Sequence, residues 1–216
     1  MAAPIIKIEG LSKAYGTKII LQNVSLDINK GEILGIMGVN GSGKSTLLNS
    51  VIGYLDPEEG HVLFEVGEEN GKPVYQQVHK RKNIAKKMFG FAAQEPSYYD
   101  KLTVEENVDY FGVLYGLKRK VRHTNTNTVI DLMELKESRR KLGENLSGGM
   151  QKRLDFACSL IHEPKVLLLD EPTSEMDPIL RKEIWSLINR IRDKGTTVVI
   201  ASHYIEEIED MTIFLF

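Results

Sequence analysis

The segment "ILGIMGVNGSGKST", residues 33 to 46, carries the most specific pattern in the chain. Its first five residues are typical of a strand buried on both faces, and the loop after them fits G-x-x-x-x-G-K-[ST]. Glycines in such a loop let successive backbone N–H groups point at phosphate oxygens. The strand before the loop and the helix after it distinguish a phosphate-binding loop (P-loop) from an ordinary glycine turn. We therefore predict nucleotide binding.

Both the backbone and the side chains of the P-loop are expected to contact the nucleotide. Lys44 can reach the β- and γ-phosphates, and the hydroxyl of Ser45 can ligate Mg²⁺. The other predicted phosphate contacts are Gly38, Asn40, Gly41, Ser42, Gly43 and Thr46. Apolar residues then recur at helical spacing up to about Gly53, which predicts a helix directly after the loop.

A second segment, "KVLLLDEPTS" at residues 165 to 174, ends an apolar strand with two carboxylates. Ligands of parallel sheets collect at the carboxyl ends of the strands. Asp170 can hold the Mg²⁺ shell, and Glu171 can orient or deprotonate a water in line with the γ-phosphate. Pro172 biases Glu171 away from the right-handed helical region, so its carboxylate should stay at the strand tip.

Strand and helix patterns alternate around these segments. We expect strands at residues 5–10, 24–28, 33–37, 60–66, 88–93, 165–170 and 196–202. Helical patterns occupy 104–117, 128–135, a stretch from about 148, and 179–191, whereas 67–87 is mainly polar and basic. Short apolar strands separated by helices predict an α/β fold with a parallel sheet covered on both faces. We divide the chain, 1–216, into a core (about 1–93 and 162–216) and an inserted helical lobe (about 94–161).

Composition sets limits on function and location. The net charge of −2 argues against non-specific nucleic-acid binding as a main activity. The single cysteine, Cys158, cannot form an internal disulfide, which fits a reducing compartment. The start "MAAPIIKIEG" lacks the pattern of a signal peptide, and no apolar run approaches the ~20 residues that span a bilayer. We expect a soluble, cytoplasmic protein.

A second glycine-containing segment, "ENLSGGMQKRLD" at residues 144 to 155, leads into another predicted helix. Ser147 can cap that helix, and Gly148 and Gly149 let the backbone approach a bulky anion closely. The amino end of a helix built in this way can bind phosphate. Taken alone, the pattern is explained more simply by an ordinary helix cap.

Together these residues resemble one family, the nucleotide-binding domains of ABC (ATP-binding cassette) ATPases. Tyr15 stands where the family has its adenine-stacking aromatic residue, and Gln94 ends a strand as the Q-loop glutamine does. "LSGGM" at 146–150 resembles the family signature LSGGQ. Asp177 fits the D-loop aspartate, and His203 in "ASHY" fits the switch histidine. These elements follow the family's order over essentially the whole chain.

The resemblance implies a P-loop fold of the ABC type, with an antiparallel N-terminal β portion beside the mostly parallel core sheet and the helical lobe. It implies ATP and Mg²⁺ as cofactors and a head-to-tail dimer, with either a second copy or a paralogous domain, in which the signature of one chain faces the other chain's γ-phosphate. The implied catalytic residues are Glu171, His203 and Gln94, and the implied metal ligands are Ser45, Gln94 and Asp170. The implied nucleotide contacts outside the P-loop are Tyr15, Ser147, Gly148, Gly149 and Asp177.

Three features depart from the family pattern. Met150 replaces the signature glutamine, and we expect a small effect because Ser147 and both glycines are kept. Glu175 in "SEMD" would add negative charge near the subunit contact and alter dimer affinity. The chain stops at "MTIFLF", where the family continues with further strands, which indicates either a shortened or a naturally abbreviated domain.

The pattern "LTVEENVDYFGVLYGL" at 102–117 resembles the lobe of ATPases paired with ABC-2-type export permeases. This implies a subunit that drives a separate transmembrane permease from the cytoplasmic face of the membrane, with no specific nucleic acid as partner. The basic clusters at 79–87 and 116–123 fit either a membrane-facing surface or an ordinary solvated face. A cytosolic ABC clamp on nucleic acid or ribosomes is the alternative. A GTPase is disfavoured because the guanine-reading N-K-x-D pattern is lacking.

Overall fold

The fold contains two β-sheets of different kinds. The computed structural model describes residues 3–174, 176–204 and 211–216. One sheet has four antiparallel strands in the order β2 (Lys18–Asn29), β1 (Pro4–Tyr15), β4 (Glu59–Glu69) and β5 (Lys72–Gln77). The other has five parallel strands in the order β6 (Phe89–Ala92), β7 (Val166–Asp170), β8 (Thr197–Ser202), β3 (Ile33–Met37) and β9 (Thr212–Leu215). The predicted α/β fold with an antiparallel N-terminal portion is confirmed.

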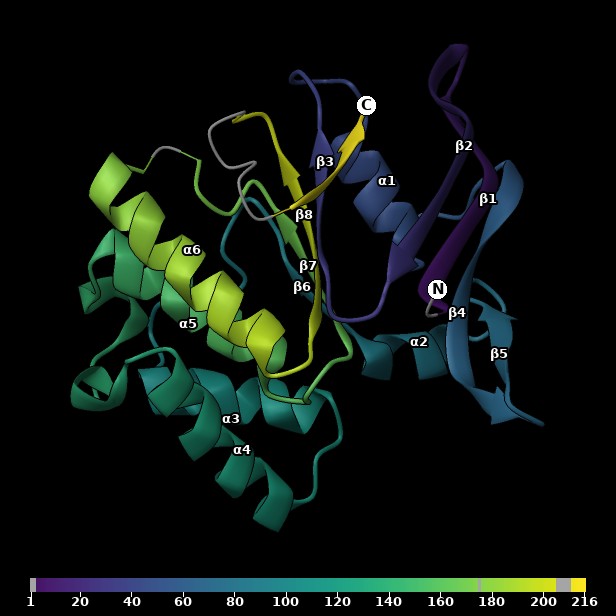
Figure 1. The fold of residues 1–216 in the computed structure, drawn as a ribbon. Coiled ribbons are helices and arrows are strands. Elements are labelled where there is room, and N and C mark those ends of the chain that lie inside the picture. Colours follow the sequence, from purple (N-terminus) through teal and green to yellow (C-terminus); the bar gives the residue numbers. More distant parts are fainter. Residues whose placement is uncertain (1–2, 175, 205–210) are drawn as a thin grey trace.

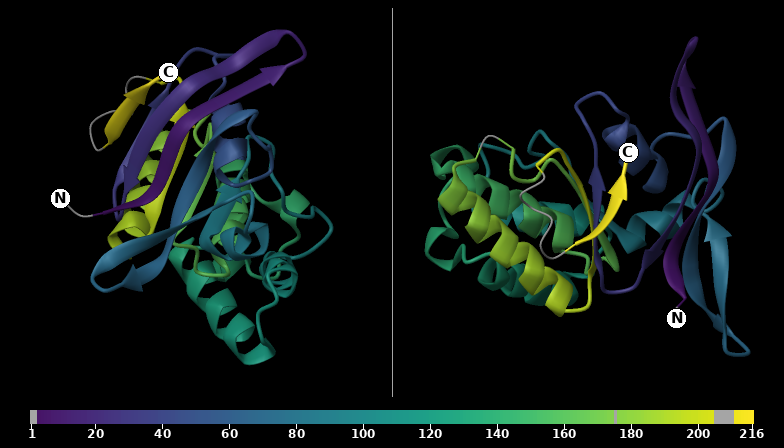
Figure 2. Two further views of the ribbon diagram at one scale, coloured as in Figure 1. Left: turned by 90° about the vertical axis from the view of Figure 1, so that its right-hand side faces the viewer. Right: turned by 45° about the horizontal axis from the view of Figure 1, so that its top comes forward.

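Helices separate and cover these sheets (Figure 1). The α-helices are α1 (Lys44–Val51), α2 (Lys82–Met88), α3 (Val104–Leu114), α4 (Arg119–Leu132), α5 (Gly148–Leu160) and α6 (Pro178–Asp193), and two short 3-10 helices are η1 (Lys136–Ser138) and η2 (Gly143–Asn145). Helix α1 lies between the two sheets, whereas α5 and α6 cover the opposite face of the parallel sheet (Figures 1 and 2). No helix within the described ranges is both long and apolar enough to cross a membrane.

The parallel sheet is buried on both faces, which explains why its strands are almost continuously apolar in the sequence. In β8, Val198 and Ile200 belong to the core on the side of α5 and α6, whereas Val199 and Ala201 belong to the core on the side of α1. Successive side chains of a strand point to opposite faces, so one strand supplies both cores.

Two elements differ from the sequence-based expectation. Residues 67–87, predicted as polar, contain strand β5 and helix α2. Asn70 and Gly71 lie at φ 51° and 73°, the left-handed geometry of a two-residue hairpin turn, and this Asn-Gly signal was overlooked. Helix α4 begins at Arg119 rather than near residue 128. The sequence does not predict its first turns because they are exposed and basic and show no apolar periodicity.

Helices α3, α4 and α5 follow one another between β6 and β7, within the stretch assigned to the helical lobe. The core on the side of α5 and α6 extends from strand residues such as Leu167 to Val108 of α3 and Ile130 of α4 without a break. The division into core and lobe at residues 94 and 161 stays a prediction.

His162 lies two residues after the end of α5 and is partly buried. Its ring stacks on Tyr115 with 3.6 Å between the ring centroids and an interplanar angle of 12°. Its Nε2 lies 3.0 Å from the carbonyl oxygen of Phe89, which can only accept, so Nε2 carries the proton. Burial lowers the pKa of His162 from 6.5 to about 4, although the bond to Phe89 acts in the opposite direction.

This shift predicts a loss of stability in mild acid. Between pH 6.5 and about 4 the unfolded chain binds a proton at His162 that the folded chain does not, so the free energy of unfolding falls as the pH is lowered. A His162→Phe variant keeps a stacked ring but has no group to titrate, so its free energy of unfolding should fall less between pH 6.5 and about 4. At about pH 4 the parent should have lost roughly 3 kcal/mol more than the variant. Urea unfolding at several pH values measures this, and parallel curves for the two proteins would contradict it.

Candidate functional site

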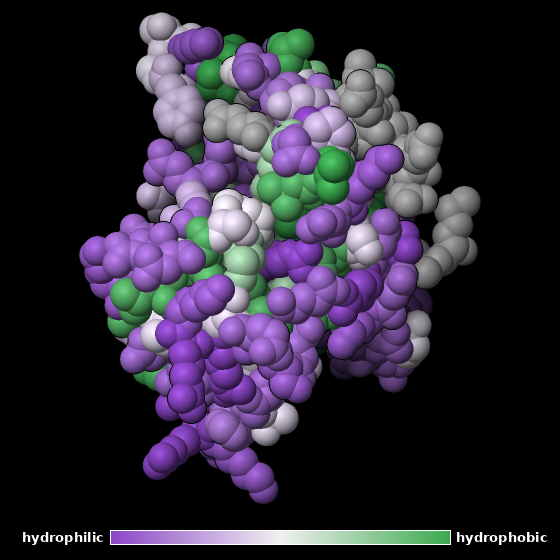
Figure 3. All heavy atoms as spheres, turned by 90° about the vertical axis from the view of Figure 1, so that its left-hand side faces the viewer, coloured by the Kyte–Doolittle hydropathy of each residue, from purple (hydrophilic) through white to green (hydrophobic). Residues whose placement is uncertain are grey.

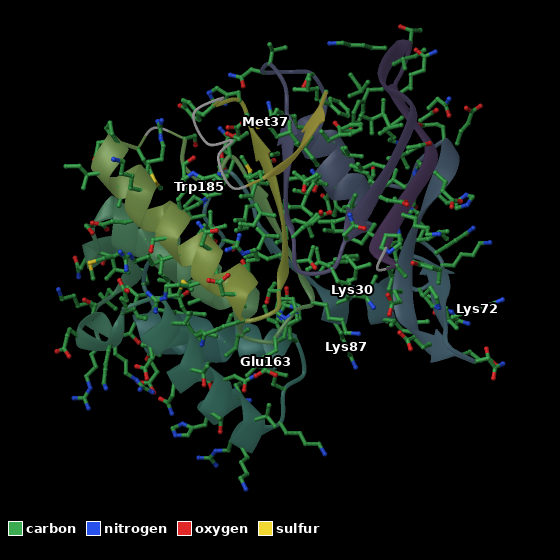
Figure 4. All side chains as sticks on the ribbon, viewed as in Figure 1. Lys30, Met37, Lys72, Lys87, Glu163 and Trp185 are labelled. Atoms are coloured by element: carbon green, nitrogen blue, oxygen red, sulfur yellow. The ribbon has the colours of Figure 1, made fainter. Side chains whose placement is uncertain are left out.

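The predicted site residues follow the carboxyl ends of the parallel strands. Because these strands run in one direction, their ends meet at one edge of the sheet. Met37 of β3 pairs with Ser202 of β8, and Asp170 of β7 pairs with Ala201, so the three strands end almost level. Figure 4 labels Met37 at this edge, and Lys30, just before β3, at the opposite one. The loops after these strands therefore open into the same space.

The P-loop is a tight turn that only glycine permits at two places. Gly41 and Gly43 lie at φ 81° and 111°. A Cβ atom on Gly43 would lie 2.9 Å from Cγ2 of Ile20, closer than Cβ atoms are found to other atoms, and 3.1 Å from Cδ2 of Leu21, which is also a tight contact. The loop is closed by a hydrogen bond from Ser42 N to the carbonyl oxygen of Val39 at 3.2 Å.

Lys44 turns back over this loop. Its side chain is 5% exposed, and Nζ donates to the carbonyl oxygens of Gly38 at 2.8 Å and Val39 at 3.3 Å. Oε1 of Glu171 lies 3.3 Å from the same ammonium. The ammonium therefore lies directly over the loop whose N–H groups are predicted to bind phosphate.

A cavity of about 370 Å³ lies beside Lys44 and is lined by all three predicted catalytic residues. Its lining residues are Ile20, Asn40, Gly41, Gly43, Lys44, Ser45, Thr46, Gln94, Glu171, Ser174 and His203. The structure thus brings Gln94, Glu171 and His203 together from three different strand ends. Ile20 and Ser174 also line the cavity, but they carry no motif signal of their own that would predict this from the sequence.

Glu171 is held by several contacts at once. Its Oε2 lies 2.7 Å from Nδ1 of His203, and its backbone N–H donates to the carbonyl oxygen of Ala201 at 2.9 Å. The residue lies at φ 49°, so it avoids the right-handed helical region, as Pro172 predicts, but adopts the left-handed one rather than an extended conformation. Such backbone strain is common at functional sites, where surrounding contacts hold a side chain in place.

Asp170 carries a buried carboxylate oxygen, Oδ1, that has no hydrogen-bond partner among the described residues. Burial raises the pKa of this carboxyl and the charge of Glu171 adds to the rise, whereas a hydrogen bond from Ser45 and the charge of Lys44 lower it. Mg²⁺ prefers oxygen ligands and is held by one or two carboxylates together with the substrate's phosphates. An unpaired carboxylate oxygen beside the Ser45 hydroxyl therefore fits a magnesium ion.

The signature segment borders a different cavity, of about 440 Å³. Its lining residues are Gln94, Glu95, Pro96, Gly148, Gln151, Lys152, Glu171, Pro172, Ser174 and Met176. It shares Gln94, Glu171 and Ser174 with the cavity beside Lys44, so the two spaces adjoin.

Within the described part of a single chain, the signature residues Ser147, Gly148 and Gly149 do not line the cavity beside Lys44. Ser147 caps α5 by accepting a hydrogen bond from Met150 N at 3.4 Å. Gly149 packs so closely on Leu180 of α6 that a Cβ would collide with it. The predicted helix cap is present, and the glycine also serves helix packing.

Tyr15 and Asp177 line neither cavity. Tyr15 ends β1 with its ring half exposed and the ammonium of Lys13 6.0 Å from the ring centroid. Asp177 caps α6 by accepting hydrogen bonds from Ile179 N at 2.9 Å and Leu180 N at 3.0 Å. Their roles toward nucleotide stay predictions, and Glu175 lies outside the described residues.

This site defines the class of protein. A strand leads into a glycine loop and then a helix that begins with a buried lysine, and carboxylates lie at the edge of the parallel sheet beside them. This arrangement is that of a P-loop nucleotide-binding protein. Comparison with known families narrows this class. Residues 21–174 match the sequence model of the family described as ABC transporter. The chain belongs to this family and is an ABC ATPase domain.

Individual relatives agree with this assignment. The chain is 35% identical over 208 residues to the probable multidrug ABC transporter ATP-binding protein YbhF of Escherichia coli (strain K12), covering 95% of this chain and 34% of that protein. It is 33% identical to the linearmycin resistance ATP-binding protein LnrL of Bacillus subtilis (strain 168), covering 95% of this chain and 63% of that protein. The chain thus spans less than two thirds of the length of these relatives.

Solved structures show the same fold. The cbiO1 protein from Clostridium perfringens, part of the ABC transporter complex cbiONQ, matches with a TM-score of 0.86 and 29% identity, covering 99% of this chain and 84% of that one. The ATP-binding cassette MJ0796, solved as a dimer in a post-hydrolysis state bound to ADP and Pi, matches with a TM-score of 0.80 and 27% identity, covering 98% and 94%.

The steric confinement of Gly43 leads to a test of the loop. A Gly43→Ala variant combines positive φ with a collision against Ile20, so the loop must shift and ATP affinity should fall at least ~10-fold, or about 1.4 kcal/mol. Gly71→Ala is the matched control, because Gly71 also has positive φ but nothing within 4 Å of the added Cβ. Equilibrium binding of a fluorescent ATP analogue measures both. Equal affinity in the two variants would show that confinement of the loop is unimportant.

Proposed function

We propose that this chain binds and hydrolyses ATP with Mg²⁺ and that it powers an export-type ABC transporter. The observation that carries the proposal is the cavity in which Lys44, Ser45, Gln94, Glu171 and His203 meet. These side chains supply a cation for phosphate, a hydroxyl for the metal, and groups that can orient a water.

Each residue has a role that its position supports. Asp170 and Ser45 would hold Mg²⁺, together with Gln94, and the bound ion would neutralise charge that develops on the phosphates. Lys44 would exchange the carbonyls of Gly38 and Val39 for phosphate oxygens.

Glu171 would orient the attacking water and accept its proton, and His203 would hold the Glu171 carboxylate in place through its contact at Oε2. Tyr15, whose ring is half exposed at the end of β1, would stack on the adenine.

The acid-base role of Glu171 is tested by replacement with glutamine. Glu171→Gln keeps the size and one oxygen of the side chain but cannot take a proton, so ATP hydrolysis should fall at least ~10²-fold while ATP binding is retained. Lys44→Ala is the contrasting variant and should lose binding, because the charge that faces the β- and γ-phosphates is gone. Steady-state phosphate release and nucleotide binding separate the two effects. Parental turnover by Glu171→Gln would show that another group activates the water.

We further propose that two chains combine head to tail, each signature contacting the nucleotide held by the partner's P-loop. The separation of the signature from the cavity beside Lys44 supports this arrangement. Ser147, Gly148 and Gly149 stand at the amino end of α5, where backbone N–H groups can face an anion. Asp177, at the amino end of the adjacent α6, would lie near the same contact. The partner would be a second copy or a paralogous domain.

A complementation experiment tests this arrangement. Lys44→Ala should inactivate the P-loop and Ser147→Arg should block the signature, so each protein alone should have almost no ATPase activity. Mixed dimers contain one intact P-loop facing one intact signature, so a mixture should recover activity if one composite site can turn over without the other. Phosphate release over a range of mixing ratios measures this. Weakened ATP binding by monomeric Ser147→Arg would instead assign the serine to its own chain's site.

The transport part of the proposal rests on the relatives, whose names include multidrug, linearmycin-resistance and Nod-factor-export ATP-binding proteins. These favour transport over a clamp on nucleic acid or ribosomes. The partner would be a transmembrane permease, and the chain would lie at the cytoplasmic face of the membrane, bound through that partner.

In Figure 3 the face that carries the helices is mostly hydrophilic, with hydrophobic residues in small groups. We assign residues 94–161 as the lobe that contacts the permease.

A further inference from the structure

Helix α5 carries a stripe of three polar side chains on a buried face: Lys152, Asp155 and Ser159. Their spacing of three and four residues places them on one side of the helix. They are 7%, 0% and 3% exposed. None of them belongs to the P-loop, to LSGGM at 146–150 or to the strand that ends at Asp170, although Lys152 lines the cavity beside the signature. An aspartate inside the apolar run 154–160 is the sequence signal that marks them.

All three side chains bind the backbone of the segment that contains Gln94. Oγ of Ser159 donates to the carbonyl oxygen of Phe91 at 2.9 Å, and Nζ of Lys152 donates to that of Ala93 at 3.4 Å. Oδ1 of Asp155 accepts from both N and Oγ of Ser97, at 3.0 and 2.8 Å. The contacts therefore lie on both sides of Gln94, before it at 91 and 93 and after it at 97.

Packing alone does not account for this arrangement. Oδ2 of Asp155 is buried without a hydrogen-bond partner among the described residues, and Nζ of Lys152 lies 3.9 Å from it. Burial raises the pKa of Asp155 and lowers that of Lys152, which reflects the free-energy cost of charges in this position. Apolar side chains would fill the same space without that cost. What the charged groups add is a fixed position for the backbone around Gln94.

We propose that Asp155, supported by Lys152 and Ser159, is a positioning residue that holds Gln94 in the site and connects it to α5, the helix that Ser147 caps. A shift of α5 would then move Gln94 relative to Lys44 and Glu171. The inference rests on the proposed role of Gln94 in hydrolysis. It adds a direct connection, inside one chain, between the signature and the nucleotide cavity.

The test begins with the acceptor atom. Asp155→Ala removes both hydrogen bonds to Ser97 and should lower kcat about 10- to 100-fold, because small displacements of a positioned group cost rate, while the KM for ATP stays within about twofold. Asp155→Asn keeps an oxygen that can accept from Ser97 and should restore most of kcat. Ser97→Ala, which removes only the hydroxyl donor, is the milder variant and should give a smaller fall.

Asn125→Ala is the matched structural control. Asn125 is 6% exposed and donates to the carbonyl oxygen of Ile161 at 2.9 Å, so it is also a buried polar side chain bound to backbone. This hydrogen bond lies outside the segment 91–97 that contains Gln94. It should lower the thermal midpoint without lowering kcat measured at a temperature where the protein is folded. An equal loss of kcat in Asn125→Ala would mean that general destabilisation explains the effect and would overturn the inference.

A double variant identifies the route of the effect. If Asp155 acts through Gln94, adding Asp155→Ala to Gln94→Ala should lower kcat by less than about twofold beyond Gln94→Ala alone. Three outcomes would each overturn this inference while leaving the proposed role of Gln94 intact. In the first, the two losses of kcat multiply fully in the double variant. In the second, Asp155→Asn restores no activity, and in the third, Asp155→Ala keeps the parental kcat although Gln94→Ala lowers it. Parental kcat in Gln94→Ala would overturn the proposed role of Gln94 and, with it, this inference.

Discussion

The positive charge of Lys44, almost closed off from solvent, is the feature around which the site is arranged. A buried ammonium without partners costs several kcal/mol, so the surrounding structure must supply negative groups. Two P-loop carbonyls and the carboxylate of Glu171 do so. These same contacts hold the loop in its turn and bring Glu171 to the cavity wall. The charge that is expected to attract phosphate thus also organises the groups that would act on it.

The parallel sheet makes this convergence possible. Its strands are adjacent in space but far apart in the chain, and they end nearly level at one edge. Lys44, Glu171 and His203 therefore line one cavity although they are far apart in the chain. The steric fit of Gly43 against Ile20 adds a second restraint, because it presses the loop against the antiparallel sheet. Both sheets consequently contribute to the position of the P-loop.

Helix α5 connects the signature to the segment that contains Gln94. Its amino end carries Ser147 and Gly149, the latter packed on α6, and its polar face binds the backbone on both sides of Gln94. The cavity beside the signature adjoins the cavity beside Lys44 without merging with it. A single chain therefore has two adjoining cavities, and this geometry suits the proposed partner chain, whose nucleotide would be contacted by the signature.

Local patterns in the sequence were sufficient for the fold class, the P-loop and the strand that ends at Asp170, because each depends on residues close together in the chain. A buried strand must be apolar, and a phosphate loop must have glycine where φ is positive. The same patterns did not predict β5, whose residues are only partly buried and mostly polar, or the first turns of α4, where exposed residues show no apolar periodicity. It also could not show that Ser174 borders the cavity or that Glu171 contacts both Lys44 and His203. Those contacts, and the hydrogen bonds from Ser97 to Asp155, join residues that are distant in sequence. Only the packing of helices and strands in three dimensions therefore determines them.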